Sequence, residues 1–125
     1  MNQKYNILYV DDEKQNLHAF RAIFRRFFNV YVAGGGSEAL DLLKNQSVHL
    51  VLSDQRMPQM TGVELCENVM KMYPDSVRMI VTGYSEMDPI LNAIEDGKIK
   101  TYIMKPWKTQ ELKHIIESAI QQSTH

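Results

Sequence analysis

The strongest constraint on the fold is a regular alternation of short apolar runs with segments whose apolar residues repeat at helical spacing. The third run, V-H-L-V-L-S, is nearly all apolar, which is typical of a strand covered on both faces. Strands that alternate with helices predict a parallel sheet with helices on both faces and right-handed crossovers. The five predicted strands are Tyr5–Val10, Asn29–Ala33, Val48–Ser53, Val77–Thr82 and Thr101–Met104.

The segments between these strands carry helix start and stop signals. Ser37 follows three glycines and is predicted to cap a helix that runs through Asn45. Thr61, with Glu64 three residues later, predicts a capping box for the next helix. A further helix is expected from Ser85 to Asp96, followed by Gly97 as a left-handed cap, in a run of five helices. Apolar faces are predicted for the first helix (Leu17, Phe20, Phe24, Phe27) and the last (Leu112, Ile115, Ile116, Ala119, Ile120).

Length and composition fit one ordinary globular domain covering residues 1–125. The net charge of −1 argues against a basic face that binds nucleic acid directly. One cysteine, Cys66, excludes an internal disulfide and fits a reducing compartment, and its place in a helical apolar pattern predicts a core position. No signal peptide or membrane span is expected, so the chain is interpreted as soluble and cytoplasmic. The polar tail 121–125 is expected to start a linker, or to mark where a longer chain was cut.

Polar side chains follow four of the five predicted strands. Asp11 and Asp12 follow the first strand, Asp54 the third, Thr82 ends the fourth, and Lys105 follows the fifth. Because chemistry in open α/β sheets gathers at the carboxyl ends of the strands, these side chains are expected to meet at one edge. Taken singly, each is an ordinary surface or helix-capping residue, but their shared position at strand ends favours a common site.

Three carboxylates at one site repel one another unless a cation is present, and Mg²⁺ prefers oxygen ligands. A carboxylate can act as the nucleophile of phosphoryl transfer, which otherwise needs positioning and positive charge on the transferring oxygens. Asp54 supplies a nucleophile, Lys105 a cation and Thr82 a hydroxyl donor. The set therefore predicts a Mg²⁺-dependent phosphoacceptor.

The motifs that carry this set resemble, in order and over about residues 5 to 120, a response-regulator receiver domain of the bacterial two-component systems. The resemblance implies a flavodoxin-like three-layer α/β sandwich with a five-stranded parallel sheet in the order 2-1-3-4-5. The matching stretches are I-L-Y-V-D-D-E (7–13), A-G-G-G-S-E-A-L (33–40), S-D-Q-R-M-P-Q-M-T-G-V-E-L (53–65), V-T-G-Y (81–84) and K-P-W (105–107).

This resemblance implies a role for each acid. Asp54 would accept a phosphoryl group from the phosphohistidine of a sensor histidine kinase. Asp12 and Asp54 would bind Mg²⁺ directly, together with the backbone carbonyl of Arg56. Asp11 would act through a metal-bound water. Such a chain is a signalling acceptor rather than a turnover enzyme, and it catalyses only its own phosphotransfer and slow dephosphorylation.

The resemblance also implies a switch. Lys105 and Thr82 would bind the phosphoryl oxygens, and a cis peptide would join Lys105 to Pro106. Movement of Thr82 would let Tyr102 turn inward and alter the face made by the fourth helix, the fifth strand and the fifth helix. That face would control an effector domain and, in the phosphorylated state, is expected to support a homodimer.

Three further positions carry expectations. Arg56 and Tyr84 stand two residues after the acceptor and after the switch hydroxyl, and their bulk predicts slow self-dephosphorylation. Trp107 is predicted either to pack at the start of the last helix or to belong to an interface. The Q-R-M-P and K-P-W stretches resemble receivers fused to an effector, such as cyclic-di-GMP phosphodiesterases or activators of sigma-54 transcription.

Three other hypotheses were weighed against the receiver. Gly34–Ala39 fits the G-x-G-x-x-A pattern of dinucleotide binding, but it follows the second strand, whereas that fingerprint belongs after the first. A haloacid-dehalogenase-type phosphohydrolase would carry a second aspartate where Arg56 stands. A degenerate, partner-binding receiver would lack the acceptor, the lysine or the acid pair, and all of these are present.

Overall fold

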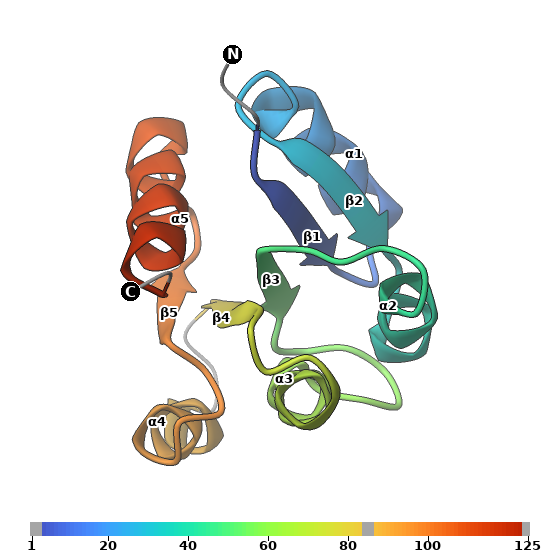
Figure 1. Ribbon diagram of the computed structural model, residues 1–125, viewed down its shortest axis with the longest axis vertical. Coiled ribbons are helices and arrows are strands. Elements are labelled where there is room, and N and C mark those ends of the chain that lie inside the picture. The colour runs from blue at the N-terminus through green and yellow to red at the C-terminus, as the bar shows by residue number, and fades with distance from the viewer. Residues whose placement is uncertain (1–3, 84–86, 124–125) are drawn as a thin grey trace.

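The five predicted strands form one parallel sheet in the order β2-β1-β3-β4-β5 in the computed structural model, which describes residues 4–83 and 87–123. Figure 1 shows α1 and α5 on one face of this sheet and α2, α3 and α4 on the other. The three-layer fold and the strand order are therefore as predicted. The elements are β1 (Asn6–Val10), α1 (Lys14–Phe24), β2 (Asn29–Ala33), α2 (Gly36–Leu43), β3 (Leu50–Asp54), α3 (Gly62–Met72), β4 (Val77–Thr82), α4 (Met87–Glu95), β5 (Thr101–Met104) and α5 (Thr109–Ser123).

Alternation along the inner strand β1 divides the core between the two faces of the sheet. Ile7 and Tyr9 pack with the apolar faces of α1 and α5, and Leu8 and Val10 pack with α2 and α3. A third cluster beneath α4 contains Cys66, which is fully buried as predicted. Burial raises the pKa of the Cys66 thiol to about 12, so it remains a protonated core side chain at neutral pH.

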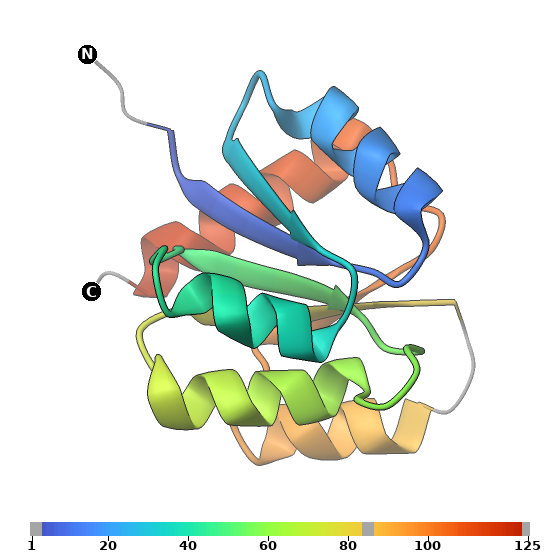
Figure 2. The same cartoon turned by 90° about the vertical axis from the view of Figure 1, so that its right-hand side faces the viewer.

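The parallel register brings the carboxyl ends of the strands to the same edge. Val10 of β1 pairs with Ser53 of β3, so the next residues of the two segments, Asp11 and Asp54, emerge side by side. The arrowheads of β1 and β3 point toward that edge in Figure 2. No helix in the described ranges is long and apolar enough to cross a membrane.

The third strand begins later than predicted, at Leu50 instead of Val48, and extends to Asp54. The reason is local to His49, whose exposed ring accepts a hydrogen bond at Nδ1 from the Asn6 backbone N–H (2.9 Å). The His49 backbone N–H in turn donates to the Asn6 carbonyl (2.8 Å). In a regular ladder the Asn6 N–H would donate to a backbone carbonyl, but here it donates to the His49 side chain. The regular strand therefore starts after His49.

The prediction that Ser37 caps α2 is wrong. The helix starts one residue earlier, at Gly36, with Gly35 at the N-cap and no side-chain cap. The Glu38 carboxylate in the first turn accepts from the Gly34 N–H (2.7 Å) and so satisfies a donor before the helix. The helix also ends at Leu43, short of Asn45.

The other helix signals were mostly correct. Thr61 and Glu64 form the predicted capping box, with distances of 3.1 and 2.9 Å. Gly97 has the expected positive φ of 75°. Ser85, predicted to open α4, lies outside the described residues. Ile115 departs from the predicted apolar face of α5 because it is 37% exposed, whereas its neighbour Ile116 is fully buried.

We expect the two cap sites to respond differently to alanine. Thr61→Ala should lower the free energy of unfolding by about 1 kcal/mol, because it leaves the Glu64 N–H without its acceptor. Ser37→Ala, the matched control, should change it by less than about 0.5 kcal/mol, because this side chain caps nothing. Urea unfolding of both variants measures the difference, and equal losses would contradict the assignment of the two N-caps.

Candidate functional site

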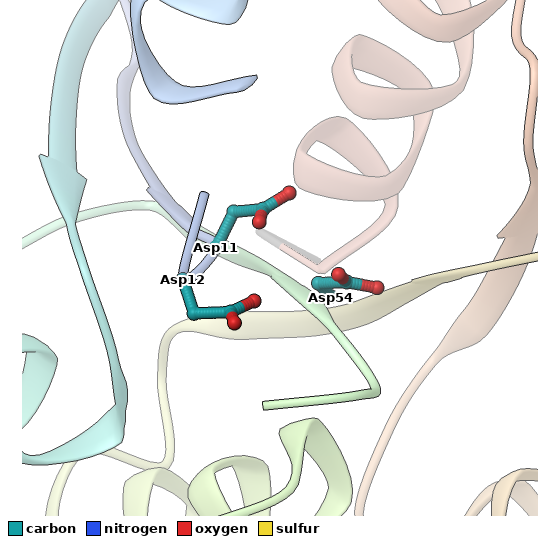
Figure 3. Close-up of side chains that lie close together, drawn as sticks. All are labelled: Asp11, Asp12 and Asp54. Atoms are coloured by element: carbon teal, nitrogen blue, oxygen red, sulfur yellow. The ribbon is translucent and has the colours of Figure 1, made fainter. Parts of the chain in front are cut away.

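Three aspartates meet at the carboxyl edge of the sheet. Asp11 and Asp12 follow β1 and Asp54 ends β3, and Figure 3 shows their carboxyl groups gathered together. One oxygen from each lies within 4.8 Å of the others. Asp11 is fully buried, the Asp54 side chain is 14% exposed and Asp12 is exposed. The strand ends thus bring together the three predicted acids in a group of oxygen donors of the kind that Mg²⁺ prefers.

The buried carboxylate of Asp11 is held by three hydrogen bonds. Its Oδ1 accepts from the Glu13 backbone N–H (2.9 Å), and its Oδ2 accepts from the Tyr9 hydroxyl (3.1 Å) and from Asn16 Nδ2 (3.0 Å). Burial, and secondarily the nearby Asp11 charge, raise the pKa of Tyr9 far above its ordinary value. The phenol is therefore neutral, and its hydroxyl donates a hydrogen bond to the Asp11 carboxylate.

Tyr9 and Asn16 were missed as site residues by sequence reasoning. A signal was present for Tyr9, because side chains two apart on a strand share a face, and Tyr9 stands two residues before Asp11. Asn16 stands in the first turn of α1, and its reach to Asp11 depends on the angle at which that helix leaves the strand.

The carboxylate of Asp54 faces a cation and a second acid. Lys105 Nζ lies 3.3 Å from Asp54 Oδ1. Burial raises the pKa of Asp54, the ammonium of Lys105 opposes this, and the charge of Asp11 adds to the rise. The net direction is upward, so Lys105 alone does not compensate for confinement of this carboxylate beside another acid.

Thr82 and Lys105 are joined through their backbones. Thr82 is almost fully buried at the end of β4, and its carbonyl accepts from the Lys105 N–H (2.8 Å). The peptide from Lys105 to Pro106 is cis, as predicted. Tyr102 is half-buried on β5, in register with Ile80 of β4. Tyr84 lies outside the described residues.

The loop after Asp54 is attached to the body of the domain by Gln55, a third residue that sequence reasoning missed. Gln55 is buried, its N–H donates to the Val81 carbonyl, and its side-chain Oε1 accepts from the Val63 N–H (2.9 Å). A Cβ on Gly62 would meet the Asp54 carbonyl oxygen at 2.5 Å, so only glycine permits this close approach. Arg56 follows in the same loop with an exposed side chain.

Comparison with known proteins identifies the family. The family model described as the response regulator receiver domain matches residues 7–117. The chain belongs to this family. Receiver domains act as signalling phosphoacceptors and bind Mg²⁺ at an acidic cluster, and Asp11, Asp12 and Asp54 form such a cluster here.

Curated relatives of the receiver include regulators and a phosphotransferase. The hydrogenase transcriptional regulatory protein HoxA of Bradyrhizobium diazoefficiens is 39% identical over 97% of this chain. The chain covers only 25% of that relative's length. The sporulation initiation phosphotransferase F of Bacillus subtilis is 32% identical, and the match covers 94% of this chain and 93% of that protein.

Solved structures agree with this assignment. A response regulator receiver domain protein from Clostridium thermocellum superposes with a TM-score of 0.89 at 27% identity, over 96% of this chain and 97% of that one. The signal receiver domain of an HD domain-containing protein from Pseudomonas fluorescens gives a TM-score of 0.89 at 30% identity, over 99% and 92%. The receiver hypothesis, favoured over dinucleotide binding and phosphohydrolase chemistry, is confirmed at the level of the family.

We expect Asp54→Asn to raise the midpoint of thermal unfolding in EDTA. A carboxyl whose pKa is raised in the folded state binds its proton more tightly there, so its ionised form at pH 7 destabilises the fold. The amide removes that charge. Added Mg²⁺ should narrow the difference, because a ligand bound by the native wild type stabilises it by mass action.

Differential scanning calorimetry measures both effects. Asp75→Asn is the matched control, because Asp75 is exposed in the turn before β4 and outside the acidic cluster. An Asp54→Asn variant less stable than the wild type in EDTA would show that the pair with Lys105 outweighs burial and repulsion.

Proposed function

We propose that Asp54 is the phosphoacceptor of this receiver. A carboxylate oxygen of Asp54 attacks the phosphorus of a phosphohistidine on a sensor histidine kinase, the phosphorus–nitrogen bond breaks, and its electron pair returns to the imidazole. The observation that carries this proposal is the contact of Lys105 Nζ with Asp54 Oδ1 at 3.3 Å inside a cluster of three acids. This contact places the Asp54 nucleophile and the Lys105 cation side by side.

The remaining acids are proposed to hold the cation. Asp12 and Asp54 would bind Mg²⁺ with the backbone carbonyl of Arg56, and Asp11 would act through a metal-bound water. When bound, Mg²⁺ would offset the charge on the transferring oxygens. The fit is supported by the charges themselves, because three carboxylates within 4.8 Å leave an excess of negative charge that one lysine does not neutralise.

The signal is proposed to leave through α4, β5 and α5. Thr82 would move toward the phosphoryl group and Tyr102 would turn inward. Two observations support this route. The Thr82 carbonyl accepts a hydrogen bond from the Lys105 N–H, and Tyr102 stands three residues before Lys105, on β5. Helices α4 and α5 each carry an exposed apolar side chain, Leu91 (45%) and Ile115 (37%). They suit contact with an effector domain or with a second phosphorylated copy.

We expect incubation with acetyl phosphate and Mg²⁺ to add one phosphoryl group to the intact protein. The gain should disappear in Asp54→Asn, which lacks the nucleophile, and in EDTA, which removes the cation. Intact-protein mass spectrometry reads the result. A gain retained by Asp54→Asn would disprove the acceptor assignment, and repeated turnover of p-nitrophenyl phosphate would revive the phosphohydrolase alternative.

We also expect slow self-dephosphorylation, because Arg56 and Tyr84 would crowd the water that attacks the phosphoaspartate. The double variant Arg56→Asn/Tyr84→Ala should shorten the lifetime of the phosphorylated state by about tenfold, which corresponds to about 1.4 kcal/mol in the barrier. Decay of the phosphorylated mass after removal of acetyl phosphate gives the lifetime. A double variant that decays at the wild-type rate would refute the steric explanation.

A further inference from the structure

Tyr9 is a fully buried polar residue that the proposed phosphotransfer does not use. It lies on the inner strand β1, and its hydroxyl donates to Asp11 Oδ2 at 3.1 Å. A phenol without a partner would be costly in this position, and the carboxylate of a cation-binding residue provides that partner. The contact therefore joins the apolar core directly to the acidic cluster.

Aromatic neighbours fix the ring of Tyr9, and with it the direction of the hydroxyl. Phe20 of α1 stacks on Tyr9 with centroids 4.1 Å apart and an interplanar angle of 4°. Trp107 meets both rings edge-on, at 6.4 Å from Tyr9 and 6.3 Å from Phe20, each at 76°. Stacked and edge-to-face pairs are the favourable aromatic geometries. The hydroxyl is thus held in place by helix α1 on one side and by the segment that leads into α5 on the other.

The donors around Asp11 set its orientation before any cation binds. Tyr9 and Asn16 share Oδ2, and the backbone N–H of Glu13 occupies Oδ1. Of these three donors, only the Tyr9 hydroxyl belongs to a side chain of the apolar core. Asp11 is proposed to hold a metal-bound water, and residues that orient such a carboxylate tune the affinity for the metal without touching it.

Trp107 is connected to two of the three acids of the cluster, Asp11 and Asp54. It stands two residues after Lys105, whose ammonium pairs with Asp54, and its ring contacts Tyr9, whose hydroxyl pairs with Asp11. A change at either carboxylate therefore reaches the same indole. From Asp11 the route runs through the ring of Tyr9, and from Asp54 it runs through Lys105 and the short K-P-W segment. The indole lies immediately before α5, which begins at Thr109.

We propose that Tyr9 is a positioning residue for Asp11 and that its contact with Trp107 couples occupation of the acidic cluster by a divalent cation to the start of α5. This inference rests on the proposed Mg²⁺ site. It adds a route to α5 that starts at the metal side of the cluster, separate from the one through Thr82 and Tyr102. Of the two roles predicted for Trp107, it favours packing at the start of the last helix, where contact with Tyr9 makes the indole responsive to the acidic cluster.

Tyr9→Phe tests the positioning role, because phenylalanine keeps the ring contacts and removes only the hydroxyl. Calorimetric titration of the whole chain with Mg²⁺ should show about tenfold weaker binding than in the wild type. Tyr31→Phe is the matched control, a half-buried tyrosine of β2 that packs in the other core cluster, and it should bind as the wild type does. In an Asp11→Asn background, adding Tyr9→Phe should have no further effect, because Tyr9 acts through that carboxylate.

The coupling has its own readout, because Trp107 is the only tryptophan in the chain. Mg²⁺ should change its emission in the wild type with the dissociation constant found by calorimetry, and Asp11→Asn should diminish the change. This measurement does not depend on the folding of Tyr9→Phe, whose cooperative unfolding is checked separately.

The outcomes separate the two proposals. Tyr9→Phe that binds Mg²⁺ within twofold of the wild type would overturn the positioning role. Wild-type emission that does not change at saturating Mg²⁺ would overturn the coupling. A wild type that binds no Mg²⁺ by calorimetry would overturn the proposed function and this inference with it, whereas either of the first two results would leave the acceptor assignment intact.

Discussion

The interaction on which the rest of this structure depends is the repulsion among three carboxylates at the edge of the sheet. Full charges near 5 Å repel by roughly 3 kcal/mol at an effective dielectric constant of about 20. The fold holds Asp11 and Asp54 in this arrangement because Asp11 follows β1 and Asp54 ends β3, two inner strands of the sheet, where neither can move away without breaking the parallel register. The parallel register keeps the acids from moving apart, and a bound cation would offset the repulsion between them.

The three acids are compensated unequally. Asp11 is fully buried and accepts three hydrogen bonds, so its charge is solvated by fixed protein donors. Asp54 has one lysine opposite it and a raised pKa, so it is the acid with the most to gain from added positive charge. Asp12 is exposed to water. The compensation therefore favours a fixed Asp11 and a reactive Asp54, although both are aspartates at adjacent strand ends.

Much of this arrangement could be predicted from the sequence, because strand ends in a parallel sheet share an edge whatever the details of packing. Three strands have the predicted bounds, and the acids meet where the pattern of strand ends places them. The failures are contacts between segments distant in sequence or dependent on angle. Ser37 did not cap its helix, β3 started after His49, and the role of Gln55 depends on tertiary neighbours that no local pattern encodes. For Tyr9, the spacing of two residues from Asp11 was a local signal that sequence reasoning missed.

Those missed residues share a physical role, which is to convert a flexible strand end into a fixed one. A strand controls its own residues through the ladder, but the first residue beyond it has no ladder partner on one side. Tyr9 supplies a side-chain partner for Asp11 from within β1, and Gln55, the residue directly after Asp54, ties the chain to α3 and β4. Placement of the acids therefore follows from topology, whereas their orientation comes from neighbours one and two residues away.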